Sequence, residues 1–366
     1  MTSHCLLKWF WYCQKERDVR YIFITLKLKK PNMKNKDTVN KFERLQYPST
    51  KDGYAESVNP ADDKEILHRL DKFGLVVVPV LSTDEQSRLL DSFFHESNKQ
   101  QRPGATHKLS LDPLTHGNQN WPAKSHFLVK RRPTIAFEPT LTRTHPLVHK
   151  VFTTIFGTDK LVSSIDRFGI MRGTVDVPTQ QADGSVRLEN QPQWRQNLVL
   201  HWDMNPWSVE DANGNLIYKQ RYQALISVLD SPVNGGGFRA VVGSHKYYMQ
   251  QWADKNKMPE DYSIKTYQQV KISSEDPAQN MSQNLPVKAG DLLVFDSRLL
   301  HGTFQNNSPK MRLVQYVRMM PQSMAKGDVF SAVNVLERHP DWRKVLKSYN
   351  LDERAQRLLG LEDYNI

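Results

Sequence analysis

The stretch HWDMNPW, residues 201–207, holds a histidine and an aspartate on either side of a tryptophan. Successive side chains of an extended strand point to opposite faces, so His201 and Asp203 would face one side together and Trp202 the other. Two histidines and one carboxylate form a ligand set that leaves three positions open, which suits oxygen-activating non-haem Fe(II). The spacing therefore predicts two of the three ligands of a metal site.

A candidate third ligand, His301, lies in the segment 289–321. This segment has a Gly-Asp turn, an apolar strand, the histidine, a polar turn and a returning strand that opens with Arg312. We expect a hairpin that places His301 and Arg312 on neighbouring strands, facing one interior. A small dianionic co-substrate could then chelate the metal at one end and bind the guanidinium through two hydrogen bonds at the other.

A second His-x-Asp, His339-Pro340-Asp341, serves as a comparison. It lies in a helical segment interrupted by proline, and no histidine follows it to complete a ligand set. We predict that it is the start of a helix or a surface turn.

Four features together resemble the phytanoyl-CoA dioxygenase family of Fe(II)- and 2-oxoglutarate-dependent oxygenases. They are HWD at 201–203, HGT at 301–303, an arginine eleven residues after His301, and the glycine-rich segment GGGFRAVVGSHK at 235–246. The helix, strand and LSTDEQ turn of residues 63–95 resemble the opening of the same family, so the resemblance extends over about residues 63–321.

The resemblance implies roles for five residues. His201, Asp203 and His301 would be the iron ligands and the catalytic set, Arg312 would bind the distal carboxylate of 2-oxoglutarate, and Thr303 would assist Arg312. It also implies Fe(II), 2-oxoglutarate and O2 as cofactor and co-substrates, with ascorbate as a reductant. The expected reaction hydroxylates a small organic or lipid-like substrate and releases succinate and CO2.

The chain departs from the family in three places. Val242 replaces the usual proline before Gly243, the glycine run at 235–237 is longer than expected, and DANGNLIYKQ, residues 211–220, is an insertion. Because all three fall near the expected mouth of the site, phytanoyl-CoA itself is not the expected substrate.

After about Leu161 short β-prone runs follow one another with turn residues between them, and no helix intervenes at each step. This pattern favours an antiparallel sandwich or barrel. The expected fold is mainly β with flanking helices, a double-stranded β-helix (jelly-roll, cupin-like) barrel. We expect a basic tail over 1–60, the oxygenase domain over 61–325, and an extension of one or two short helices over 326–366.

The net charge of +11 is concentrated in the tail. Residues 1–50 hold 11 Lys and Arg against 4 Asp and Glu, a balance of +7, which leaves +4 for the other 316 residues. Nucleic acid is therefore not an expected partner. Cys5 and Cys13 also lie in the tail, so the main body has no cysteine chemistry. We hypothesise that residues 1–32 are an upstream extension of the reading frame.

No apolar run approaches the length of about 18 residues that spans a bilayer. We expect a cytoplasmic protein, with mitochondria and peroxisomes as alternatives, and nothing in the sequence assigns an oligomeric state.

Several residues have alternative roles. Trp202, Trp207 and Arg195 could line the pocket or serve the core, Arg167 and Arg172 could face the interior or pair outside it, and His245 is expected to be structural.

Three rival functions remain open. A cupin-like isomerase or metal-storage protein would bind metal without 2-oxoglutarate, and a binding module would have no enzymatic activity. A related oxygenase could act on a macromolecule.

Overall fold

A computed structural model describes residues 45–101, 103–122, 128–129, 134–207, 222–259, 269–326 and 328–364. The hypothesis on residues 1–32 and the insertion at 211–220 concern residues outside these ranges. No helix in the described part of the chain is both long enough and apolar enough to cross a membrane.

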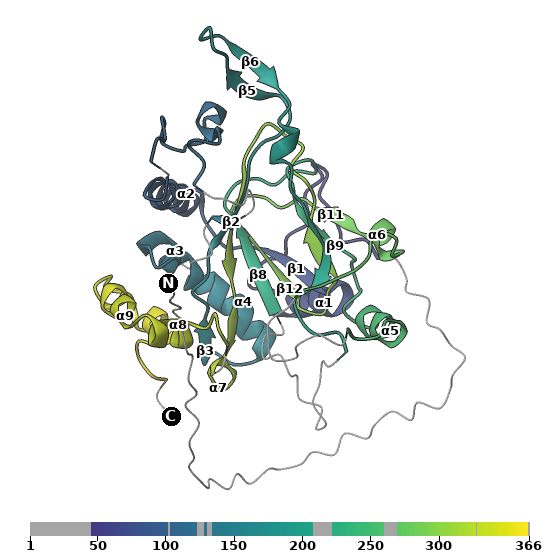
Figure 1. The fold of residues 1–366 in the computed structure, drawn as a ribbon. Coiled ribbons are helices and arrows are strands. Elements are labelled where there is room, and N and C mark those ends of the chain that lie inside the picture. The colour runs from purple at the N-terminus through teal and green to yellow at the C-terminus, as the bar shows by residue number, and fades with distance from the viewer. Residues whose placement is uncertain are drawn as a thin grey trace, which may run out of the picture. The chain divides into compact units, whose positions relative to one another are not determined.

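Two antiparallel sheets form the centre of the fold (Figure 1). The six-stranded sheet has the order β1 (Leu75–Pro79), β12 (Asp291–Asp296), β8 (Tyr222–Ser227), β14 (Arg312–Val317), β4 (Phe168–Met171) and β2 (Leu128–Val129). The five-stranded sheet has the order β10 (Val270–Lys271), β7 (Leu198–Trp202), β13 (His301–Thr303), β9 (Phe238–Ala240) and β11 (Gln283–Leu285). From β12 to β14 the chain alternates between the sheets, as in a jelly roll.

The expectation of a mainly β jelly roll with flanking helices is confirmed. Within the described ranges no strand belongs to both sheets, so the two sheets face each other without a hydrogen-bonded closure. Two smaller pairs complete the strands: β3 (Leu161–Ser163) with β15 (Met319–Pro321), and the projecting hairpin of β5 (Val177–Gln180) and β6 (Val186–Glu189).

Alternation along each strand divides the core into layers. In β14, Val314 packs between the sheets, whereas its neighbour Leu313 packs on the outer face against helices. The same parity turns Arg312 and Tyr316 toward the interior between the sheets. In β7, Leu200 and Trp202 pack on the outer face, which leaves His201 facing inward.

Helices cover the outer face of the six-stranded sheet. The apolar faces of α1 (Asp63–Phe73), α2 (Thr83–Asn98) and α4 (Pro146–Phe156) share one buried cluster with that sheet. The helix α2 begins after Ser82, whose side chain and that of Glu85 form a capping box. The other sheet is covered by α5 (Tyr248–Lys255). Shorter helices are η1 (Pro113–His116), α3 (Phe137–Arg143), η2 (Pro192–Trp194), α6 (Ala278–Met281) and α7 (Gln322–Ala325).

The C-terminal segment forms three helices, so the expectation of one or two is wrong. They are α8 (Ala332–Arg338), α9 (Pro340–Lys347) and α10 (Glu353–Leu358). His339 has φ −131° and ψ 69° and separates α8 from α9, because the residue before a proline avoids helical backbone. The second His-x-Asp is thus a helix start, as predicted. All three helices pack in one cluster with Val162 and Met320.

Candidate active site

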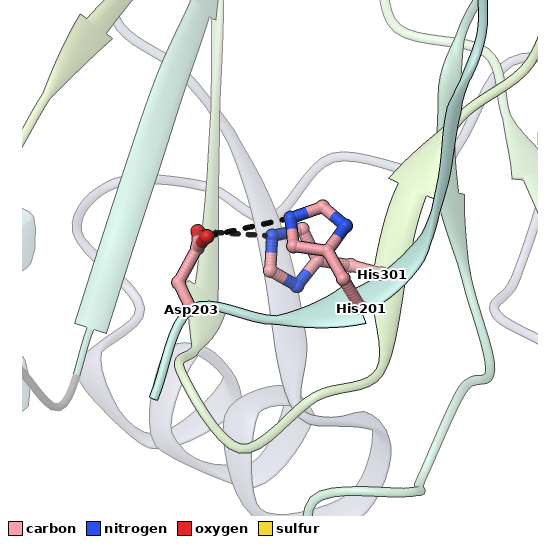
Figure 2. A group of neighbouring side chains, drawn as sticks. All are labelled: His201, Asp203 and His301. Carbon is pink, nitrogen blue, oxygen red and sulfur yellow. Dashed lines mark ion pairs between the residues drawn. The ribbon is translucent and has the colours of Figure 1, made fainter. Parts of the chain in front are cut away.

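His201, Asp203 and His301 converge between the sheets (Figure 2). The two histidines occupy directly paired positions on β7 and β13, and Asp203 follows β7 by one residue. The Nε2 atoms of His201 and His301 lie 3.4 Å from Oδ1 and Oδ2 of Asp203, respectively. One ligand atom from each residue lies within 4.8 Å of the others, the arrangement of a facial set of two histidines and one carboxylate. We refer to these three residues as the His–Asp–His trio.

The backbone fixes the orientation of both histidine rings. Nδ1 of His201 lies 2.7 Å from the carbonyl oxygen of Val199, and Nδ1 of His301 lies 2.9 Å from that of Leu299. Because a carbonyl oxygen only accepts, each Nδ1 must be the donor. In the neutral rings Nε2 then carries a bare lone pair, directed at Asp203.

This arrangement fits a divalent cation. Nε2 of His201 is buried and has no hydrogen-bond partner among the described residues. A lone pair facing an anionic oxygen is repulsive, and a cation among the three groups turns that repulsion into three bonds. Burial lowers the pKa of His301, and the charge of His201 lowers it further, which favours the neutral form that binds metal.

The surroundings of Asp203 also favour metal binding, because they keep its carboxylate ionised and oriented. Burial raises the pKa of Asp203, but the imidazoles of His201 and His301, when protonated at Nε2, donate to its carboxylate, outweigh burial and hold that pKa well below its usual range. Two amides donate to it from other elements: Gln223 Nε2 to Oδ2 at 3.2 Å and Gln269 Nε2 to Oδ1 at 3.1 Å. Asp203 is therefore ionised and oriented before any ligand arrives.

The expected hairpin of His301 and Arg312 is wrong, although the shared interior is right. β13 pairs with β7 and β9, whereas β14 pairs with β4 and β8 in the opposite sheet. The connection 304–311 therefore crosses from one sheet to the other. Arg312 faces His301 across the interior and does not lie beside it on a neighbouring strand.

Within the described ranges, Arg312 is buried without a counter-charge. The residue is 2% exposed, and Nε and Nη1 have no hydrogen-bond partner among the described residues. Burial lowers the pKa of its guanidinium, and Tyr316 partly offsets that effect. Thr303 lies at the same end of the interior, where its hydroxyl accepts from the backbone N–H of Leu198 at 2.9 Å. The hydroxyl proton of Thr303 thus remains available to a ligand.

A single cavity of about 250 Å³ joins these groups. The His–Asp–His trio, Thr303 and Arg312 all line it, and both sheets contribute to its walls. Its apolar lining includes Leu225, Phe238 and Phe295. The cavity therefore combines a candidate cation site, an unpaired guanidinium and an apolar wall.

The residues with alternative roles divide clearly. Trp202 is buried behind the site and donates from Nε1 to the carbonyl oxygen of Arg298 at 3.0 Å. Trp207 packs against Trp252, and Arg195 is exposed outside the cavity. Arg167 lines the cavity, but Arg172 is buried elsewhere, against Trp121 and Trp194. His245 is structural, as expected, with Nε2 3.0 Å from the carbonyl oxygen of Asp71.

Sequence reasoning missed several cavity residues. Tyr316 and Arg318 could have been found, because they continue the alternation that starts at Arg312. Gln223 and Phe330 gave no such signal, because pairing and packing of segments distant in sequence bring them to the cavity.

Comparisons with known proteins agree with the resemblance. Residues 188–314 match the family model described as phytanoyl-CoA dioxygenase (PhyH). A Dictyostelium discoideum protein named "Putative phytanoyl-CoA dioxygenase" is 22% identical over 247 residues, which cover 60% of this chain and 65% of that protein. "Ava biosynthesis cluster protein O" of Aspergillus versicolor is 26% identical over 191 residues, with coverages of 50% and 54%. The chain thus spans less than two thirds of the length of either relative.

Solved structures that align with this chain include EctD from S. alaskensis with 2-oxoglutarate and 5-hydroxyectoine. It has a TM-score of 0.44 and 17% identity, with 76% of this chain and 81% of that chain covered. AviO1 from Streptomyces viridochromogenes has a TM-score of 0.43 and 15% identity, with coverages of 72% and 96%. The family match contains the His–Asp–His trio and Arg312, so residues 188–314, the segment that supplies these site residues, are similar to the phytanoyl-CoA dioxygenase (PhyH) family.

Proposed function

We propose that this protein is a non-haem Fe(II)- and 2-oxoglutarate-dependent dioxygenase that hydroxylates a small organic molecule. The observation that carries the proposal is the pairing, in one cavity, of the His–Asp–His trio with the unpaired, buried guanidinium of Arg312. A buried cation without a partner is costly, so Arg312 calls for an anion. The family match over residues 188–314 supports the same activity.

His201, Asp203 and His301 would hold Fe(II) through two Nε2 atoms and one carboxylate oxygen. Arg312 would bind the distal carboxylate of 2-oxoglutarate through two parallel hydrogen bonds, and the hydroxyl of Thr303 would donate a third. These contacts orient the keto acid end toward the trio. Gln223 and Gln269 would keep Asp203 in its ligating orientation.

Fe(II) with 2-oxoglutarate and O2 supplies an oxidation in which 2-oxoglutarate becomes succinate and CO2 while one oxygen atom enters the organic substrate. The protein's own residues position both substrates and exclude water. The apolar wall of Leu225, Phe238 and Phe295 suits the second task. A cavity of this size favours a small molecule over a macromolecule as the substrate.

Anaerobic titration of the apoprotein with Fe(II) and then 2-oxoglutarate tests the proposal. We expect a weak visible metal-to-ligand charge-transfer band in the wild type and none in His301→Ala. Arg312→Gln should retain iron but need roughly 10- to 100-fold more 2-oxoglutarate, because charge-assisted hydrogen bonds are lost.

His339→Ala is the matched control, because His339 belongs to the second His-x-Asp and is exposed. It should leave the band unchanged. Full iron occupancy without a band would favour the isomerase or storage function, and failure to bind iron would favour a binding module.

A further inference from the structure

The end of the cavity opposite Arg312 carries two more arginines. Arg318 follows Arg312 by six residues on β14 and just beyond it, a separation of about 20 Å at about 3.4 Å per residue. Arg167 lies at the same end, because its carbonyl accepts from the backbone N–H of Tyr316 at 3.2 Å. Both arginines line the cavity.

The His–Asp–His trio lies toward the Arg318 end of β14. Asp203 accepts from Gln223, whose neighbour Ala224 pairs with Val317 at the far end of β14. Arg312 begins the same strand, close to the connection from Thr303. A molecule bound at Arg167 and Arg318 would therefore approach the trio from the side opposite to 2-oxoglutarate.

The two guanidinium groups at this end approach one carboxylate, that of Asp166, at different distances. Arg318 Nη2 lies 3.2 Å from Oδ2 of Asp166, whereas Arg167 Nε lies 3.6 Å from Oδ1 of Asp166, beyond a normal hydrogen bond. Arg167 thus makes only a long ion pair with the carboxylate that Arg318 approaches more closely. Nε of Arg167 is buried and has no hydrogen-bond partner among the described residues.

Phe330 holds the two guanidinium groups in place. The Cζ atom of Arg318 lies 4.3 Å from the centroid of its ring, and that of Arg167 lies 5.6 Å away, within the range of cation–π contacts. The side chain of Arg318 is 6% exposed and that of Arg167 is 28% exposed. Arg167 is therefore the group that an incoming molecule meets first.

We propose that the organic substrate carries an anionic group, a carboxylate or a phosphate, bound by Arg167 with Arg318 at this end of the cavity. The apolar wall beside the trio, where the rings of Phe238 and Phe295 lie 5.8 and 4.6 Å from that of His301, would hold an apolar body, so the substrate class is an acid with a short apolar chain. This inference rests on the proposed function, because it assigns a substrate to the same cavity.

Binding of three probes with one chain length tests the inference: hexanoate, hexyl phosphate and hexanamide. Each is titrated by calorimetry, without O2, into protein loaded with Fe(II) and saturated with 2-oxoglutarate. We expect at least one anion to bind roughly tenfold or more tightly than the neutral amide. The tighter of the two anions identifies the group that the site prefers.

Variants separate this site from Arg312. Arg167→Gln should remove most of the preference for the anion, Arg167→Lys should retain part of it, and Arg195→Gln, outside the cavity, should change nothing.

The inference is overturned if the amide binds as tightly as the anions, if no anion binds, if Arg167→Gln has no effect, or if the anions displace 2-oxoglutarate. A normal charge-transfer band alongside any of these results overturns this inference alone. Absence of the band overturns the proposed function and the inference with it.

Discussion

At the scale of single residues, metal binding depends on which atom of each side chain remains available as a ligand. Both histidines use Nδ1 on a carbonyl of their own chain and present Nε2 to the interior. Asp203 is held by two amides that come from outside its own strand. The ligands are therefore oriented by neighbours that would not themselves touch the metal.

Gln223→Leu tests that support. The substitution keeps the approximate volume of the side chain but removes the donor to Oδ2 of Asp203, so we expect Fe(II) to bind roughly tenfold more weakly. Calorimetric titration with Fe(II) measures the change. Gln250→Leu, on the exposed face of α5, should leave the metal affinity as it is, and equal affinities in the two variants would contradict the assigned role of Gln223.

At the scale of elements, the pairing of β7 with β13 brings the two histidines together. It depends on Gly302, since a Cβ atom at that position would lie 2.3 Å from the carbonyl oxygen of Leu198. No backbone can tolerate so short a contact, so any larger residue would force β13 away from β7.

Gly302→Ala should therefore affect both stability and metal binding. We expect the free energy of unfolding to fall by about 1–3 kcal/mol, the range for overpacking, and metal affinity to fall with it. Urea unfolding and Fe(II) titration measure the two effects. In Gly184→Ala, at a turn with φ 83° and no atom near the added Cβ, about 1 kcal/mol should be lost through backbone strain alone, with metal affinity intact.

The strands were predictable because their apolar runs are short and bounded by turn residues, and the i, i+2 spacing correctly placed His201 and Asp203 on one side. The partner of β14 was not predictable. An eight-residue connection such as 304–311 can close a hairpin or cross the distance of about 10 Å between stacked sheets, and local sequence does not distinguish the two. Whether Gln223 and Phe330 reach the cavity depends on which of these two connections forms.

At the scale of the whole molecule, folding buries a carboxylic acid away from the site. Asp291, the first residue of β12, is 7% exposed, and burial raises its pKa from 3.8 to about 6. Between these pH values the folded state keeps a proton that the unfolded state has released. Asp291 therefore contributes stability that is present below about pH 4 and lost as the pH rises through about 6.

Comparison of the wild type with Asp291→Asn isolates this effect. The wild type should lose up to about 3 kcal/mol relative to the variant between pH 4 and pH 7, since one pKa unit corresponds to about 1.4 kcal/mol. Urea unfolding of both proteins across this range gives the difference. Parallel curves would show that burial of Asp291 does not perturb its ionisation.

The order of groups along the cavity has a kinetic consequence. Arg312 lies at the buried end, the trio follows, and Arg167 lies at the more exposed end. An organic substrate seated at Arg167 would obstruct the route to Arg312, so 2-oxoglutarate must enter first and succinate must leave last. Turnover would then follow a compulsory sequence. A non-reactive substrate analogue would inhibit uncompetitively against 2-oxoglutarate, whereas random entry would give a different inhibition pattern.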